Sequence, residues 1–417
     1  MNLLSSYKTT CNIRPRHFTI LCLLVLCLLV IKTKAQYNFI RYDSSRVVFG
    51  KDSSAFMKLY GKMDDLKNGK RDRVTIVHYG GSHIQAGFWS EKLIDNFQAL
   101  GNFEGGGVWA FPYKIAKTNG PPFYRSFSDG RWKRCRCALA KEMCPNLGMN
   151  GIAAVTNDSA TNFGVKITTN NHHKNFNTVK VYHNFNASFE ISLGEQAGLP
   201  SKRSDDKSKG YTEFTFENYI DSINFQLIRK DTLQRDFMLY GISLENNKPG
   251  YYYAGFGVNG ASSSSFLRCP LLVDQLKTLK PDLVIFSLGV NDTQGKDFTK
   301  ADFIAHYDSL IALIKKASPD CAILFTTTSD NYIARKTPNK RPIRAEEAMY
   351  DLMQKHKAAV WDLYEVMGGY RSIYKWYKSG LAAKDKVHFN SRGYYIVGQL
   401  MFEALERSYR YNSKVGK

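Results

Sequence analysis

The sequence predicts an α/β fold interrupted by an antiparallel β insertion, and three observations carry this prediction. Near-continuous apolar runs of strand length, such as residues 282–288, are typical of a parallel sheet covered on both faces. Amphipathic segments with helical spacing alternate with these runs. From about residue 121 to 248 the texture changes to short alternating segments separated by polar turns, as in an antiparallel β-sandwich.

The first part of the α/β pattern spans about residues 36–120. Residues 56–66 have helical spacing, 74–79 form a β-branched strand ended by Gly80-Gly81, and 89–100 form an amphipathic helix. Ser82 therefore lies between a strand and a helix. This is where open α/β sheets place ligands and reactive groups.

The middle part, 121–248, is predicted to be a β-sandwich inserted into the α/β domain. No long helical pattern occurs here. The alternating segments predict strands, and the run Ser201–Lys207 reads as a polar turn. The predicted strands are 164–168, 178–182, 187–191 and 223–227.

The α/β pattern returns over residues 249–417. We expect helices over 266–279 (with Pro281 as its stop), 299–316, 344–357 and 391–410, the last with Ser391 as its N-cap. Strands are expected over 282–288, 322–326 and 358–361.

The N-terminus is predicted to be an export signal rather than part of the fold. Arg14, Arg16 and His17 precede an apolar run over 18–31, and Ala35 is a small residue at the predicted break. We therefore expect residues 1–35 to be a signal peptide and the protein to be periplasmic, extracellular or at the cell surface. An uncleaved anchor is the alternative.

The chain is strongly basic, with a formal charge of +21. Residues 1–35 carry five of the cations and no acid, which leaves the mature chain near +16. Such an excess favours anionic envelope polymers, acidic glycans or lipid head groups as partners. Nucleic acid is not expected, because the chain has an export signal and no motif for it.

Five cysteines follow residue 35, three of them close together. In an oxidising compartment we expect a local disulfide from Cys144 to either Cys135 or Cys137. A metal site of three cysteines is the alternative. Cys269 and Cys321 are expected to be ordinary buried residues.

Four short segments supply the groups for acyl transfer through a serine: 80–83, 257–261, 289–292 and 385–388. Ser82 is the candidate nucleophile, His388 the base, and Asp385 the group that orients the base. The Ser82 backbone N–H, the Gly260 backbone N–H and the Asn291 side chain are the candidate oxyanion donors. Each segment alone could equally be a loop serine, a turn or a chance Asp-His pair.

In this order, the four segments resemble the blocks of the SGNH, or GDSL-type, hydrolase family. The resemblance covers roughly residues 72–110 and 250–412. It implies a flavodoxin-like three-layer α/β/α sandwich, the residue roles given above, and no metal or organic cofactor. One departure concerns Gly81, because the family usually has an aspartate there that braces the nucleophile loop.

The gap between the serine block and the glycine block is far longer than the family needs, and the β insertion fills it. This arrangement resembles bacterial peptidoglycan O-acetylesterases with an inserted carbohydrate-module-like β domain. The resemblance implies an exported serine esterase that removes O-acetyl groups from acetylated polysaccharide or peptidoglycan. The alternatives are a glycan-binding protein with a degenerate site, an O-acetyltransferase or a lipid esterase.

Overall fold

In the computed structural model, which describes residues 37–168, 175–194 and 200–415, the apolar runs form neighbouring strands of one parallel sheet. Their spatial order is β14-β2-β15-β16-β19, which is 2-1-3-4-5 in chain order and confirms the flavodoxin-like prediction. These strands are β2 (Arg73–Gly80), β14 (Gly250–Gly257), β15 (Leu283–Ser287), β16 (Ala322–Thr326) and β19 (Ala359–Trp361).

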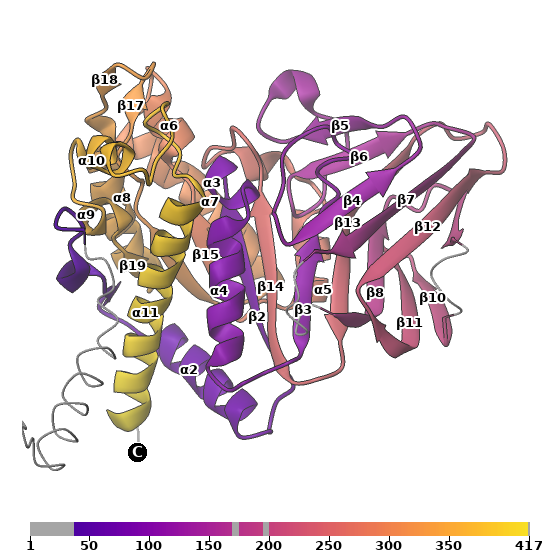
Figure 1. Ribbon diagram of the computed structural model, residues 1–417, viewed down its shortest axis with the longest axis horizontal. Coiled ribbons are helices and arrows are strands. Elements are labelled where there is room, and N and C mark those ends of the chain that lie inside the picture. The colour runs from indigo at the N-terminus through magenta and orange to yellow at the C-terminus, as the bar shows by residue number, and fades with distance from the viewer. Residues whose placement is uncertain (1–36, 169–174, 195–199, 416–417) are drawn as a thin grey trace, which may run out of the picture. The chain divides into compact units, whose positions relative to one another are not determined.

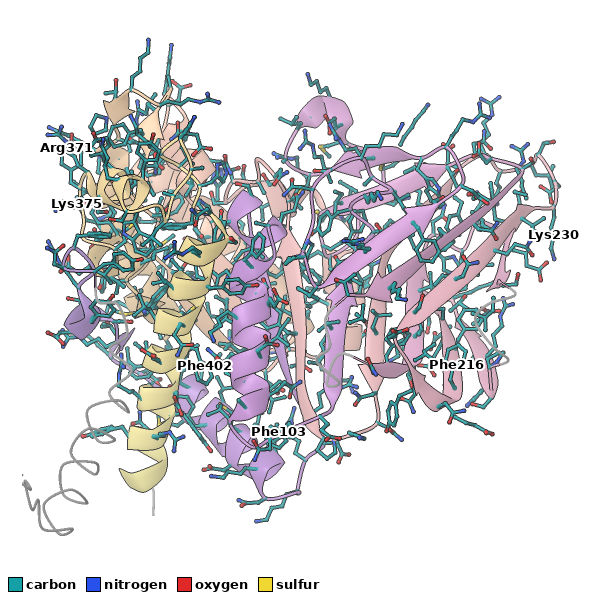
Figure 2. The ribbon with its side chains drawn as sticks, viewed as in Figure 1. Phe103, Phe216, Lys230, Arg371, Lys375 and Phe402 are labelled. Atoms are coloured by element: carbon teal, nitrogen blue, oxygen red, sulfur yellow. A yellow bond between two sulfur atoms is a disulfide. The ribbon has the colours of Figure 1, made fainter. Side chains whose placement is uncertain are left out.

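Helices cover both faces of this sheet, with one group in front and the other behind in Figure 1. The front group is α2 (Ser54–Lys67), α4 (Phe88–Ala99) and α11 (Ser391–Val415). The rear group is α5 (Leu272–Leu279), α7 (Lys300–Ala317) and α8 (Arg341–His356). Phe402 of α11, labelled in Figure 2, packs edge-on against Phe97 of α4 with ring centroids 5.3 Å apart. Such pairs hold the helices to each other as well as to the sheet.

The inserted strands do not form a separate sandwich, because some of them extend the central sheet. Beyond β14 and β3 (Gly106–Ala110), the sheet continues antiparallel through β13, β8, β11 and β10, with β6 paired to β13 and β5 paired to β6. These strands are β13 (Phe237–Asn246), β8 (Phe176–His183), β11 (Tyr211–Ile220), β10 (Lys202–Asp206), β6 (Ile152–Thr156) and β5 (Lys133–Arg136). At the opposite edge, β1 (Val47–Phe49) pairs with β19.

A second sheet of the insertion lies across this extension (Figure 1). Its order is β4-β7-β12-β9, made of β4 (Tyr124–Ser128), β7 (Ala160–Ile167), β12 (Ser222–Arg229) and β9 (Phe189–Leu193). Aromatic rings fill the space between the two sheets: Phe214 of β11 lies 5.7 Å from Phe225 of β12, and Phe189 of β9 lies 5.9 Å from Phe237 of β13. The predicted β-sandwich is therefore present, and one of its layers is continuous with the α/β sheet.

The predicted helix over 266–279 is wrong, because the chain breaks it. A 3₁₀ turn at Ser265–Arg268 ends before Pro270, and α5 begins only at Leu272. Proline disfavours a helical conformation in the residue before it, and Cys269 has φ −110° and ψ 88°.

Two smaller predictions also need correction. The run Ser201–Lys207 contains a strand, β10, and not merely a turn. It is polar because it lies at the end of the sheet order, where its side chains meet solvent. Ser391 is the first residue of α11 rather than its cap, since the Asn390 side chain accepts a hydrogen bond from the Gly393 N–H.

The predicted signal peptide, residues 1–35, lies outside the described residues. Residues 41–417 group as one unit by their contacts, so the boundaries predicted at 120 and 248 stay predictions. None of the helices in the described ranges is both long enough and apolar enough to span a membrane.

Candidate active site

The predicted site residues follow three adjacent strands at the same edge of the sheet. Gly80 ends β2 and is paired with Gly257 at the end of β14 on one side and with Ser287 at the end of β15 on the other. Ser82 lies two residues past the first of these ends. Gly260 and Asn291 follow the other two ends at similar distances along the chain. The aligned register therefore brings the first three sequence segments to one place.

The fourth segment reaches the same place through direct hydrogen bonds. Ser82 Oγ lies 2.7 Å from His388 Nε2, although the two residues are 306 positions apart. His388 Nδ1 lies 2.8 Å from Asp385 Oδ2. The structure thus brings the three predicted triad residues into one hydrogen-bonded chain. With Asp385 accepting the Nδ1 proton, Nε2 is left free to accept the proton of the serine hydroxyl.

A tight turn presets the Asp385-His388 pair. Asp385 Oδ1 accepts the backbone N–H of Val387 at 2.9 Å and of His388 at 3.0 Å, and Lys386 between them has φ 55°. Burial alone would raise the pKa of the Asp385 carboxyl. The hydrogen bonds from the His388 ring and from the two amides outweigh burial and lower this pKa below its usual value. Asp385 is therefore a carboxylate at neutral pH.

The loop after β14 presents Gly260 in a conformation that favours glycine, with φ 84°. Within the described residues, the Gly260 N–H donates no hydrogen bond to the protein. Its neighbour Asn259 is fixed, because the Asn259 N–H donates to Gln85 Oε1 at 2.6 Å. Gln85 belongs to α3 (Ser82–Gln85), the short helix that begins with the candidate nucleophile. One hydrogen bond thus joins the nucleophile segment to the Gly260 loop.

Asn291 lies at the start of α6 (Val290–Gln294), and its side chain donates from Nδ2 to the Ala261 carbonyl at 2.8 Å. An amide group carries two N–H donors, so the second remains for an oxyanion. A Cβ at Gly81 would lie only 3.2 Å from Asn291 Nδ2 and 3.4 Å from the Ala261 oxygen. The space around the residue before the serine is thus already occupied, and the bond between Asn291 and Ala261 braces the loop there.

His83, the residue after the candidate nucleophile, lies beside the triad without belonging to it. It is buried, and its Nδ1 forms a hydrogen bond with the Tyr394 hydroxyl at 3.0 Å. Its ring centroid lies 5.3 Å from that of His388. Burial, followed by the nearby His388 ring, lowers the pKa of His83 to about 3. His83 is therefore neutral at physiological pH and leaves the charge balance of the triad unchanged.

A second group of serine, histidine and aspartate lies behind the oxyanion loop. Ser263 Oγ donates to Asp292 Oδ1 at 2.5 Å and lies 3.1 Å from His306 Nδ1. The Ser263 N–H also donates to the Asp292 carboxylate. Burial raises the pKa of Asp292, against the opposing effect of the hydrogen bonds from Ser263. This group fixes the segment after Ala261 to the residue that follows Asn291.

Sequence reasoning missed the residues that fix the Gly260 loop from outside its own segment. Tyr113 donates its hydroxyl to the Gly257 carbonyl at 2.7 Å, and Arg136 of the insertion donates to the Asn259 carbonyl at 3.3 Å. The sequence carries no spacing signal for either contact. The cysteine cluster predicted a disulfide next to Arg136 but gave no indication of a role for Arg136 itself. Its bridge is Cys135–Cys144, one of the two predicted pairings, and Cys137 is buried and unbridged.

Residues 229–396 match the model of the GDSL-like Lipase/Acylhydrolase family, a range that includes Gly260, Asn291, Asp385 and His388. Ser82 lies outside the matched range, on the far side of the insertion. No curated protein matches the chain.

A solved structure of a peptidoglycan O-acetylesterase shares the fold with a TM-score of 0.69 at 18% identity, over 88% of this chain and 99% of that one. Two further matches have TM-scores too low to support an argument. They are a lipase/acylhydrolase from Enterococcus faecalis (0.31, 23% identity, 38% of this chain and 77% of that one) and a family two carbohydrate esterase from Cellvibrio japonicus (0.27, 9% identity, 69% and 99%). Over residues 229–396, the chain thus has an acylhydrolase domain of the GDSL-like, or SGNH, family, as the sequence resemblance predicted.

Proposed function

We propose that the protein is an exported serine esterase that removes O-acetyl groups from a complex glycan, with peptidoglycan as the favoured polymer. The observation that carries the proposal is the continuous chain from Ser82 Oγ through the His388 ring to the Asp385 carboxylate. An SGNH domain with these three hydrogen-bonded side chains has the nucleophile, the base and the orienting carboxylate that acyl transfer requires.

The chemistry proceeds in two steps. Ser82 Oγ attacks the ester carbonyl carbon while His388 Nε2 takes the hydroxyl proton, and the sugar hydroxyl leaves with that proton. Water then attacks the acetyl-serine, with His388 again as base, and acetate and free Ser82 result. Asp385 stays ionised throughout and stabilises the imidazolium that forms in each step.

In this proposal three N–H groups bind the oxyanion: the amides of Ser82 and Gly260 and the second N–H of the Asn291 side chain. In the tetrahedral intermediate the former carbonyl oxygen of the ester carries a full negative charge, which such donors stabilise by about 3 kcal/mol each. The scheme uses side chains, backbone and water alone.

A group of lysines and tyrosines next to the triad supports an anionic polymer as the substrate. Lys386, between Asp385 and His388 in the chain, has its Nζ 5.0 Å from the Tyr332 ring centroid and 5.6 Å from that of Tyr374. Lys378 lies over the same Tyr374 ring, which is partly exposed. Aromatic faces can stack on sugar rings, and the cations attract carboxylates or phosphates.

Two further observations favour an acetylated glycan outside the cytoplasm. The fold match to the peptidoglycan O-acetylesterase spans the insertion as well as the α/β part, since it covers 88% of the chain. The predicted signal over residues 1–35 would deliver the protein to the compartment where such polymers occur.

The test is acetate release from O-acetylated peptidoglycan and from O-acetylated xylan by the mature protein, beside its Ser82→Ala variant. We expect release that is lost in the variant, and the faster polymer identifies the substrate class. No release from either polymer, by folded protein that still binds one of them, would contradict the esterase and favour a glycan-binding role. Product formed only when a sugar acceptor is added would indicate a transferase.

A further inference from the structure

The insertion supplies a cation to the loop that carries the Gly260 N–H. We propose that Arg136 is a positioning residue, which fixes the Asn259–Gly260 peptide through its carbonyl oxygen and so aims the N–H of the same peptide at the oxyanion. This inference rests on the proposed function, and it assigns the β insertion a part in the chemical step in addition to any part in holding polymer.

Arg136 acts on a single peptide unit. Arg136 Nη1 donates to the Asn259 carbonyl oxygen at 3.3 Å. That carbonyl and the Gly260 N–H belong to one planar trans unit, in which the two groups point in opposite directions. A carbonyl fixed from outside therefore fixes the direction of the N–H. A cationic donor also strengthens the bond and polarises the amide, which makes its N–H a better donor.

The Gly260 loop needs such a restraint, because glycine at φ 84° has more backbone freedom than any other residue. The other restraints act on different groups. Gln85 accepts the Asn259 N–H, and Asn119 Oδ1 accepts the Asn259 side-chain amide at 2.8 Å. Among the residues that the structure describes, the bond from Arg136 is thus the one that acts on the carbonyl of the peptide.

Arg136 is itself held rigidly. Its side chain is only 15% exposed, and it donates to Glu142 from Nε at 2.5 Å and from Nη2 at 3.1 Å. Hydrogen bonds from Arg134 and Arg136 lower the pKa of Glu142 to about 2, so the carboxylate stays charged near neutral pH. The disulfide joins Cys135 and Cys144, which are nine positions apart, and so closes the segment that carries both partners of this ion pair.

Close packing places this segment against the loop. A Cβ at Gly260 would lie 3.7 Å from Ala138 Cβ, which is ordinary contact distance. Arg268, from the turn after the Gly260 segment, donates to the Cys137 carbonyl at 2.9 Å. The disulfide-closed segment is therefore tied to the oxyanion loop at more than one point.

Arg134 provides a matched control, because it shares Glu142 with Arg136 and differs in its other partner. It donates to Glu142 at 3.0 and 3.3 Å, but its remaining bond goes to the Lys117 carbonyl at 3.1 Å. A residue that only anchors the insertion would behave like Arg134. A positioning residue would not.

The experiment compares Arg136→Met, Arg136→Lys and Arg134→Met in the mature protein, with p-nitrophenyl acetate as probe. We expect Arg136→Met to lower kcat by roughly 10- to 100-fold with KM nearly unchanged, because the lost restraint acts on a transition-state donor. Arg136→Lys should recover part of the loss, and Arg134→Met should change kcat by less than about 3-fold. Equal losses in the two methionine variants would overturn the proposal.

A second readout does not depend on activity. Hydrogen exchange of the amides in residues 257–262, followed by mass spectrometry, should be faster in Arg136→Met and unchanged in Arg134→Met. If the wild type shows no esterase turnover, the proposed function fails, and this exchange still decides whether Arg136 holds the loop. Should Arg136→Met not fold, Arg136→Lys carries the same comparison. Unchanged exchange in the Arg136 variants overturns the inference.

Discussion

The chain holds two clusters of serine, histidine and aspartate, and they differ in the order of their hydrogen bonds. In the first, histidine is central: His388 lies between Ser82 Oγ and the Asp385 carboxylate. In the second, serine is central: Ser263 Oγ donates its one proton to Asp292 and faces His306 Nδ1. Only the arrangement with histidine at the centre leaves a base free to take a proton from the serine.

Exposure of the serine separates the two clusters as well, because Asp292 and His306 are partly exposed like the members of the first cluster. Ser82, His388 and Asp385 are all partly exposed, whereas Ser263 is completely buried. A buried hydroxyl bound to a carboxylate cannot reach a polymer. Residue composition alone therefore does not identify a catalytic triad. The connectivity of the hydrogen bonds and the access of the serine to solvent decide whether the group can react. The second cluster instead stabilises the loop beside Asn291.

The largest expected effect is on kcat, and it distinguishes His388 of the first cluster from His306 of the second. His388→Ala removes the base, and we expect kcat for acetyl ester hydrolysis to fall by a factor on the order of 10⁴ or more. His306→Ala removes a neighbour of Ser263 and should change kcat by less than about 3-fold. Steady-state kinetics of both variants decide this. Comparable losses would mean that the second cluster takes part in the reaction.

The next effect separates Asn291 from Ser263, the hydrogen-bond partner of its neighbour Asp292. Asn291→Ala removes an oxyanion donor and should lower kcat by about 10²-fold with little change in KM. Ser263→Ala leaves Asp292 without its hydroxyl partner and should instead lower the free energy of unfolding by about 1–3 kcal/mol. Kinetics and urea unfolding measured on both variants would separate these roles. A loss of stability without a loss of kcat in Asn291→Ala would contradict the assignment.

A smaller effect tests the residue before the nucleophile. Gly81→Asp restores the residue that is usual in the family, yet its Cβ would crowd Asn291 Nδ2 and the Ala261 oxygen. We expect kcat to fall roughly 10-fold, because the donor must shift by a few tenths of an ångström. Gly81→Ala, which adds the crowding without the charge, is the control. A rise in kcat for the aspartate variant would show that the natural site lacks a brace.

Much of the site could be predicted from sequence because its parts are local. Asp385 and His388 are three residues apart, and a tight turn suffices to join them. Ser82 and Asn291 follow apolar strands by two and four residues, and parallel pairing brings the ends of those strands to one edge of the sheet. Arg136 could not be found this way, because its bond to Asn259 spans 123 positions and depends on how the insertion folds back.

The same distinction holds for the fold. Strands buried on both faces, such as β2 and β15, carry their own apolar signal, whereas the edge strand β10 is polar and reads as a turn. The alternation of apolar and polar residues in the insertion predicted a β-sandwich. It could not show that one layer continues the central sheet, because strand pairing between β3 and β13 leaves no local pattern.

The smallest effect is a pair of opposite pH dependences of stability. The lowered pKa of Asp385 means that its carboxylate stabilises the native state above the unfolded pKa of about 3.9, and that this is lost as pH falls through the native value. The raised pKa of Asp292 has the reverse sign: its protonated form favours the native state at low pH, and that advantage is lost as pH rises through the native value.

Urea unfolding of Asp385→Asn and Asp292→Asn, each beside wild type at pH 6.5 and pH 3.5, measures these two signs. The destabilisation caused by Asp385→Asn should shrink at pH 3.5, and that caused by Asp292→Asn should grow. Each change should be on the order of 1 kcal/mol, since one pKa unit corresponds to about 1.4 kcal/mol and solvent screens part of it. Changes of the same sign would mean that the two carboxylates share one kind of environment. The two clusters would then differ only in which residue lies at the centre of their hydrogen bonds.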